Sequence, residues 1–171
     1  MTDAELLHEM LCRIGVEPRY KEFDDLTGHL IHLRLSCLGL VEVPREVYSF
    51  SYLQILDVGN TFAGGAQSAA PSNQIRELPP EIGRLVHLKQ LTIDNNGLIS
   101  LPPEIGRLGY LQALVASNNR ISTLTPRIGE LSRLQFLDLT DNQLAEIPPE
   151  IGNLTELMSL MVSGNLLTDL P

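Results

Sequence analysis

Hydrophobic positions recur along this chain with a period of 23 residues. The stretch LPPEIGRL at residues 78–85 returns unchanged at 101–108, and looser copies begin at Leu124 and Ile147. In each copy the first apolar positions are spaced by four and three residues, as on one face of a short helix, whereas the later ones alternate as in a strand. The pattern therefore predicts a helical turn followed by a strand in every unit.

The apolar side chains of one unit are too many for that unit to bury alone. The unit that begins at residue 78 carries them at Leu78, Ile82, Leu85, Leu88, Leu91, Ile93 and Leu98. Stacked units would cover these side chains with one another and align their strands in a parallel sheet. Prolines at the second and third positions suit the first turn of a helix, where a missing N–H costs no hydrogen bond. We therefore expect an α/β solenoid.

Each unit from the second onward also carries an asparagine beside its last apolar positions. These residues are Asn73, Asn96, Asn119, Asn142 and Asn165. A buried amide both donates and accepts hydrogen bonds, so it can satisfy backbone groups where the chain bends after the strand. Stacked units would align these side chains as a structural asparagine ladder.

The consensus of the units, LPxxIxxLxxLxxLxLxxNxLxx, resembles the 23-residue class of leucine-rich repeat. It is most similar to Ras-suppressor-type proteins, to plant intracellular Ras-group repeat proteins and to the repeat arms of bacterial multidomain proteins. The resemblance implies a curved right-handed coil with a parallel sheet on its concave face and short helical turns on its convex face. It is strict from residue 78 to residue 171 and continues upstream with departures.

The repeat domain is expected to span residues 20–171, with units that begin at residues 20, 43, 78, 101, 124 and 147. The first unit has Asp24 and Thr27 at positions that are apolar in the other units, so we expect it to be degenerate. The second unit is 35 residues long instead of 23, and its 12 extra residues fit best at 61–72. This insertion, rich in glycine and alanine, is predicted to be a surface loop that is either simply tolerated or able to close over a ligand.

Residues 1–19 precede the repeats and are predicted to form a helical cap. Thr2 and Glu5 have the spacing of a capping box, Leu7 and Met10 lie on one apolar face, and Gly15 suits the end of the helix. Such a helix would cover the exposed core edge of the first unit. The alternative is a helix that binds a partner or pairs two copies of the chain.

The formal net charge of -9 narrows the choice of partner. A field of this sign repels nucleic acid and anionic lipid, so we expect a protein or peptide partner with a basic surface, and neither nucleic acid nor a membrane. The amino terminus, MTDAELLHEM, lacks the basic and apolar segments of a secretory signal. This absence predicts a cytoplasmic protein.

Partner binding is expected on the concave face, where the side chains between the buried leucines of each strand form parallel columns. The predicted partner-binding residues are Arg34, Asp57, Asp94, Val115, Phe136, Asp138 and Met161. Val115, Phe136 and Met161 would form an apolar spot among acidic groups, which is a reasonable hot spot for a basic and apolar partner. The alternative is that these apolar side chains are scattered surface residues without a binding role.

The sequence contains no arrangement that predicts catalysis. Its four histidines fall in different units or on different faces, no serine or cysteine stands in a nucleophile motif, and no phosphate-binding glycine motif is present. We therefore expect no enzyme activity, no metal and no cofactor. Three roles stay open: a stand-alone interaction scaffold in signalling, the recognition or regulatory arm of a larger protein such as a repeat-bearing GTPase or kinase, and a structural spacer.

The last two residues of the sequence suggest what covers the C-terminal edge of the solenoid. Leu170 and Pro171 repeat the opening of a unit. Because the apolar edge of the last unit would otherwise be open to water, we expect either further repeats beyond Pro171 or a second chain packed end to end against it.

Overall fold

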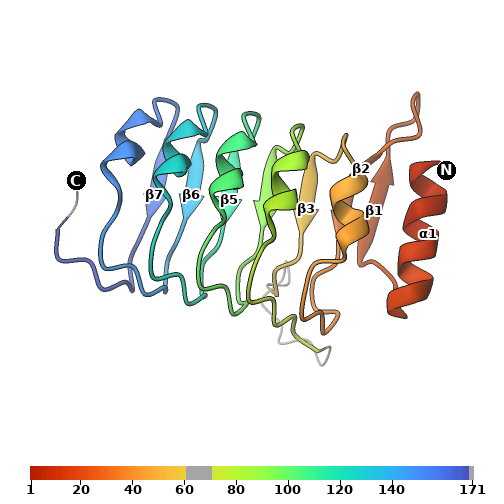
Figure 1. The fold of residues 1–171 in the computed structure, drawn as a ribbon, viewed down its shortest axis with the longest axis horizontal. Coiled ribbons are helices and arrows are strands. Elements are labelled where there is room, and N and C mark those ends of the chain that lie inside the picture. Colours follow the sequence, from red (N-terminus) through yellow and green to blue (C-terminus); the bar gives the residue numbers. More distant parts are fainter. Residues whose placement is uncertain (61–70, 170–171) are drawn as a thin grey trace.

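The chain forms a single row of stacked units with α1 at one end and β7 at the other (Figure 1). The computed structural model describes residues 1–60 and 71–169. Within these ranges the strands are β1 (Tyr20–Phe23), β2 (Leu30–Arg34), β3 (Ile55–Asp57), β4 (Gln90–Thr92), β5 (Ala113–Val115), β6 (Phe136–Asp138) and β7 (Ser159–Met161). The helices are the α-helix α1 (Asp3–Ile14) and the short 3-10 helices η1 (Arg45–Ser49), η2 (Pro80–Arg84), η3 (Pro103–Arg107), η4 (Pro126–Glu130) and η5 (Pro149–Asn153).

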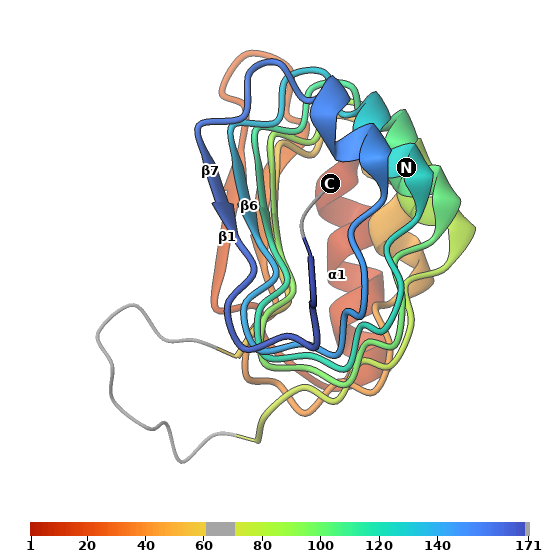
Figure 2. The ribbon, with the colours of Figure 1, turned by 90° about the vertical axis from the view of Figure 1, so that its left-hand side faces the viewer.

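The strands form one sheet in the order in which they occur along the chain. Strands β2 to β7 are parallel, whereas β1 pairs with β2 in the antiparallel direction. Figure 2 shows this sheet on one side and the 3-10 helices on the opposite side, with α1 at the far end. The predicted repeat solenoid, with a parallel sheet, helical turns and an N-terminal helix, is confirmed.

Alternation along each strand directs its central leucine into the core. Leu91, Leu114 and Leu137 are fully buried, and each pairs in register with the same position of the next strand. Burial of one leucine side chain contributes about 1.5–3 kcal/mol, so the repeated leucines dominate the stability of the array. In the last unit, by contrast, Leu160 is 36% exposed.

The asparagine side chains bind the backbone of two neighbouring units. The Asn119 amide nitrogen donates to the carbonyl oxygen of Ile93 in the preceding unit (3.0 Å) and of Ala116 in its own unit (3.1 Å). Its Oδ1 accepts from the Leu98 amide (3.0 Å). The same set of hydrogen bonds is made by Asn96, Asn142 and Asn165. Each unit is therefore tied to the one before it at the bend after its strand.

Residues 61–70 of the predicted insertion lie outside the described residues, but its flanks are placed. The Asn73 amide donates to Asn60 Oδ1 (2.7 Å), and Asn60 Nδ2 donates to the Asn73 carbonyl oxygen (2.9 Å). The Asn73 side chain in turn donates to the carbonyl oxygens of Leu35 (2.8 Å) and Val58 (2.9 Å). The chain thus returns to the repeat register at Asn73.

The helix α1 begins and ends at its capping residues. Thr2 Oγ1 accepts from the Glu5 amide (3.2 Å), Glu5 Oε2 accepts from the Thr2 amide (2.8 Å), and Gly15 adopts a positive φ of 69°. On its inner face Leu7 and Met10 are buried in the same apolar core as the repeats. The helix therefore covers the edge of the array next to β2 and η1.

The first unit has a hairpin where later units have a 3-10 helix. After β1, Asp24 Oδ1 accepts hydrogen bonds from the amides of Leu26 (3.1 Å) and Thr27 (2.8 Å). Gly28 follows with a φ of 68°, a left-handed conformation that suits glycine. The polar residues that make this unit degenerate thus build a turn, and β1 is an element that the repeat pattern does not predict.

Glycines set the distance between successive 3-10 helices. A Cβ added to Gly106 would lie 2.7 Å from the Arg127 carbonyl oxygen, and one added to Gly129 would lie 2.4 Å from the Glu150 carbonyl oxygen. These distances leave no room for a side chain. The glycine of the phrase PPEIG is therefore a packing requirement between units.

Candidate functional site

The register of the parallel strands places the predicted apolar spot on the sheet face, which is the outward side of β2 to β7. Val115, Asp138 and Met161 pair in succession in one column, and Phe136 lies on β6 in the neighbouring column. Val115 and Phe136 are half-buried, whereas Met161 is 42% exposed. The apolar spot of Val115, Phe136 and Met161 therefore occupies three adjacent strands.

Acidic groups lie beside this apolar spot. Asp138 is half-buried, and its Oδ1 accepts a hydrogen bond from the Thr140 amide (2.9 Å), which holds the carboxylate at the end of β6. Asp141, in the turn that follows, is exposed. Apolar contact area next to negative charge suits a partner that is both apolar and basic.

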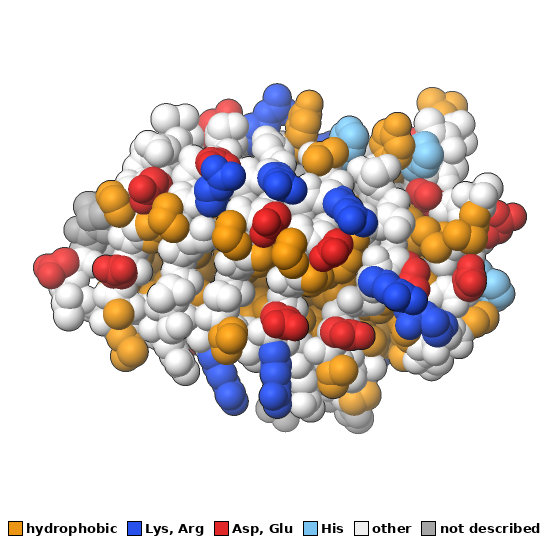
Figure 3. Space-filling model, viewed as in Figure 1, with side chains coloured by type: hydrophobic (Ala, Val, Ile, Leu, Met, Phe, Trp, Pro, Cys, Tyr) orange, Lys and Arg blue, Asp and Glu red, His pale blue; other side chains and the backbone are white. Residues whose placement is uncertain are grey.

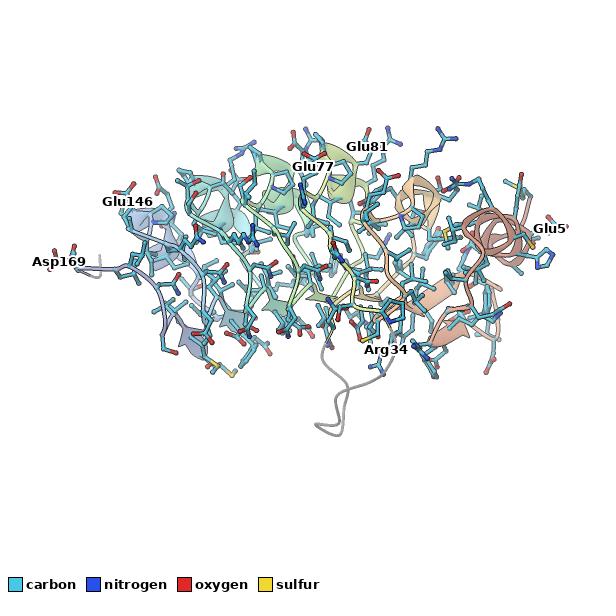
Figure 4. All side chains as sticks on the ribbon, turned by 90° about the horizontal axis from the view of Figure 1, so that it is seen from below. Glu5, Arg34, Glu77, Glu81, Glu146 and Asp169 are labelled. Atoms are coloured by element: carbon cyan, nitrogen blue, oxygen red, sulfur yellow. The ribbon has the colours of Figure 1, made fainter. Side chains whose placement is uncertain are left out.

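Arg34 and Asp57 form an ion pair near the N-terminal end of the sheet face. Arg34 Nε lies 2.8 Å from Asp57 Oδ2, and Asp57 Oδ1 accepts from the Gly59 amide (3.0 Å). Asp57 is only 8% exposed, and its pKa is raised, mainly by this burial and further by the Asp94 carboxylate, although the Gly59 hydrogen bond and Arg34 lower it. The Arg34 side chain stays partly exposed on the strand side of the molecule (Figure 4). The pair therefore presents a partly exposed guanidinium above a largely buried carboxylate.

Asp94 is the most buried of the predicted partner-binding residues. Its exposed fraction is 2%, and its Oδ1 lies only 2.0 Å from where a Cβ on Gly59 would be. Its Oδ2 accepts from the Asn95 side-chain amide (2.5 Å). The absence of a side chain at Gly59 thus lets this carboxylate lie over the preceding unit, where it is covered, and it is not displayed on the sheet face beside Asp138.

The buried carboxyl of Asp57 predicts a pH-dependent stability difference. Between the ordinary aspartate pKa and the raised one, the folded protein binds more protons than the unfolded chain, so the free energy of unfolding falls as pH rises through this window. The Asp57→Asn variant has no carboxyl group to titrate at this position, so its free energy of unfolding does not fall in this way. We expect it to be more stable than the native protein at neutral pH and equally stable in acid. Urea unfolding of both proteins across the acid range measures the difference. A gap that stays constant with pH would contradict the expectation.

A row of stacked rings crosses the turns that precede the strands. Ring centroids are 4.1 Å apart for His29 and Tyr52, 5.2 Å for Tyr52 and His87, and 6.1 Å for His87 and Tyr110, and the Arg133 guanidinium lies 4.4 Å from the Tyr110 ring centroid. Single motifs do not reveal this row. The repeat does indicate it, because each member of the row stands directly before a buried leucine of its unit. It is a second exposed surface available for contact.

The described part of the chain lacks the features of a metal centre. No group of three or more His, Cys, Asp or Glu side chains there could hold a metal ion. His32 has one carboxylate nearby, with Nδ1 3.9 Å from Glu22 Oε2, and burial lowers the pKa of the imidazole. Among the same residues, no helix has the length and apolar character needed to cross a membrane.

Comparison with known families identifies the repeat. Residues 86–144 match the family model for leucine rich repeat. A leucine-rich repeat protein of Leptospira interrogans is 34% identical over 80% of this chain and 38% of its own, with a TM-score of 0.64. Comparison with curated proteins gives no significant match.

Two plant structures are also similar. The plant peptide hormone receptor RGFR1, solved in complex with RGF2, is 33% identical over 80% of this chain and 21% of its own, with a TM-score of 0.65. The BIR3–SERK2 complex from Arabidopsis thaliana is 24% identical over 88% of this chain and 77% of its own, with a TM-score of 0.66, and shows the fold alone. This chain thus spans 38% of the Leptospira protein and 21% of the hormone receptor.

Proposed function

This chain is a leucine-rich repeat protein, and from that premise we propose that it is a non-catalytic binding module whose sheet face takes a protein or peptide partner. The observation that carries the proposal is the unbroken register of β2 to β7. It aligns the outward side chains in columns, while the leucines between them are buried in β2 to β6. An array of this kind offers a rigid contact surface that needs little ordering when a partner binds.

The chemistry of the sheet face supports a basic and apolar partner. The apolar spot supplies contact area, and Asp138 and Asp141 place negative charge next to it in a chain whose net charge is -9. Among the similar structures, RGFR1 is in complex with RGF2 and BIR3 with SERK2. By analogy, this surface is proposed to bind protein, with the apolar spot as its centre.

Phe136→Asp is expected to weaken partner binding by about tenfold or more while the chain stays folded, because a buried charge replaces the central apolar contact. The measurement is quantitative capture of partner proteins from an extract on the immobilised chain, with native and variant chains compared side by side. Circular dichroism of the variant checks the fold.

Ile99→Asp is the matched control, because Ile99 is an exposed apolar residue outside the strands. Proteins that bind through the sheet face should be lost with Phe136→Asp and retained with Ile99→Asp. A folded Phe136→Asp chain that captures the same proteins in the same amounts would remove the apolar spot from the binding site.

Finer features of the proposal rest on the sequence. These are the Ras-suppressor-type subclass, the cytoplasmic location, a place in signalling, and the second role as the recognition arm of a longer GTPase or kinase. An adaptor and an arm would use the same sheet face. They differ in whether the repeats form the whole protein or one part of a larger one. The molecular mass of the natural protein would distinguish the two roles.

A further inference from the structure

Tyr48 occupies a repeat position that is glycine in the four later 3-10 helices. Where η2 reads PEIGR, η1 reads REVYS, so Tyr48 aligns with Gly83 of η2 and Gly106 of η3. A Cβ at this position would clash with the next helix at Gly106 and Gly129 and would lie 3.0 Å from Glu104 at Gly83. A phenol ring there must separate η1 from η2, and these two helices pack less closely than η2, η3, η4 and η5 pack in succession.

The separation coincides with a groove of 760 Å³ between α1, η1 and η2. Its lining includes Arg13 of α1, Glu42 and Tyr48 in and before η1, and Glu77 and Glu81 in and before η2. Figure 4 shows Glu77 and Glu81 on the side of the 3-10 helices, opposite to Arg34. Acidic and basic side chains are interspersed over this face (Figure 3). The groove is therefore separate from the sheet face.

Three carboxylates of the groove have no partner among the residues that the structure describes. Glu46 is paired with Arg13 at 2.5 Å. By contrast, the described residues offer no ion pair or hydrogen bond to the side chains of Glu42, Glu77 and Glu81, all of which are exposed. Of the guanidiniums in the lining, only that of Arg84 is likewise without a partner among these residues. The lining as a whole holds four carboxylates and three guanidiniums, so its formal charge is -1.

The Tyr48 hydroxyl is a buried polar group of the same groove. Tyr48 is 3% exposed, and no described group makes a hydrogen bond to its hydroxyl. Buried polar groups without a partner are unfavourable and rare in native structures. Burial raises the pKa of the phenol, and the carboxylates of Glu81 and Glu42 raise it further, so these carboxylates lie within electrostatic reach of the hydroxyl.

We propose that this groove binds the ammonium group of a lysine side chain carried by a partner protein or peptide. The free carboxylates complement its charge, and the Tyr48 hydroxyl oxygen can accept one of its three hydrogen bonds. A metal ion fits less well, because no described cluster of three carboxylate, histidine or cysteine ligands could hold one. The proposed site is formed by residues in and before η1 and η2. Binding there does not depend on binding at the sheet face.

The test is a nuclear magnetic resonance titration of the full chain with the blocked pentapeptide Gly-Gly-Lys-Gly-Gly and with the same peptide acetylated on lysine. The free lysine peptide should shift the backbone amide signals of residues 42–49 and 77–84 in a saturable manner, and the acetylated peptide should not. Tyr48→Phe, which removes only the hydroxyl, and Glu81→Gln should each weaken binding by about tenfold.

Glu104→Gln is the matched control, because Glu104 holds in η3 the repeat position that Glu81 holds in η2 and does not line the groove. Its affinity for the peptide should equal that of the native chain. Absence of saturable shifts, equal binding of the acetylated peptide, or equal weakening by Glu104→Gln would each overturn the proposal. Binding of free spermine in the groove without binding of the peptide would overturn it in favour of a small polyamine.

Discussion

Gly129→Ala is expected to lower the free energy of unfolding by about 1–3 kcal/mol, the usual cost of forcing extra atoms into a packed interior. The new methyl carbon would lie 2.4 Å from the Glu150 carbonyl oxygen and 2.9 Å from Glu150 Cβ. Because the closest atom belongs to the backbone, no side-chain rotation can relieve the clash. Either η4 and η5 must move apart or the chain between them must bend, and both disturb the stacking of the units.

Gly152→Ala is the matched control for this prediction, since Gly152 holds the same repeat position in η5. A Cβ added there would meet nothing within 4 Å. Its effect is expected to be neutral, or stabilising by up to about 1 kcal/mol, because alanine has less conformational freedom than glycine in the unfolded chain. Equilibrium urea unfolding followed by circular dichroism compares the two variants. Equal effects would show that contact between η4 and η5 does not require glycine.

Asn119→Leu is expected to cost at least as much as Gly129→Ala. The substitution removes the acceptor of the Leu98 amide and the donor to the carbonyl oxygens of Ile93 and Ala116. Leucine can replace none of these bonds. The buried Leu98 amide is then left without a partner, which costs about 1–3 kcal/mol, whereas the carbonyl oxygens of Ile93 and Ala116 each keep one bond, from Asn96 and Asn142. The measurement is the shift of the urea midpoint relative to the native chain.

Asn153→Leu provides the comparison for the asparagine ladder. Asn153 is an exposed residue of η5 whose side chain makes no hydrogen bond with the described residues. The same chemical change there should alter the free energy of unfolding by no more than about 0.5 kcal/mol. A midpoint for Asn119→Leu that coincides with that of Asn153→Leu would mean that the ladder contributes nothing to stability.

The parallel sheet, the placing of its columns and the limits of α1 could all be predicted from the sequence. The columns follow from a spacing of 23 residues, which brings equivalent positions of successive units into register. The limits of α1 follow from Thr2, Glu5 and Gly15, which act within a few residues of themselves. The order β1–β2, in contrast, depends on a turn at Asp24 that interrupts the repeat and has no counterpart in later units.

The candidate site was predictable only in part. The alternation of side chains placed Val115, Phe136 and Met161 on one face, but it could not show that the Asp94 carboxylate lies over Gly59 of the preceding unit. That outcome depends on the fit between two units. The pattern of one unit does not contain this information.

By itself, the sequence determined which side chains are buried in each unit and how the units stack, because both follow from periodicity and from short-range backbone preferences. Only the tertiary structure decided what happens between units: the packing of Asp94 over Gly59, the row of rings from His29 to Tyr110, and the groove beside Tyr48. The physical reason is that these features arise where residues of different units meet. A single exception to the repeat, a tyrosine in place of glycine, changes the spacing of two helices, and its consequence is set by all the groups around it.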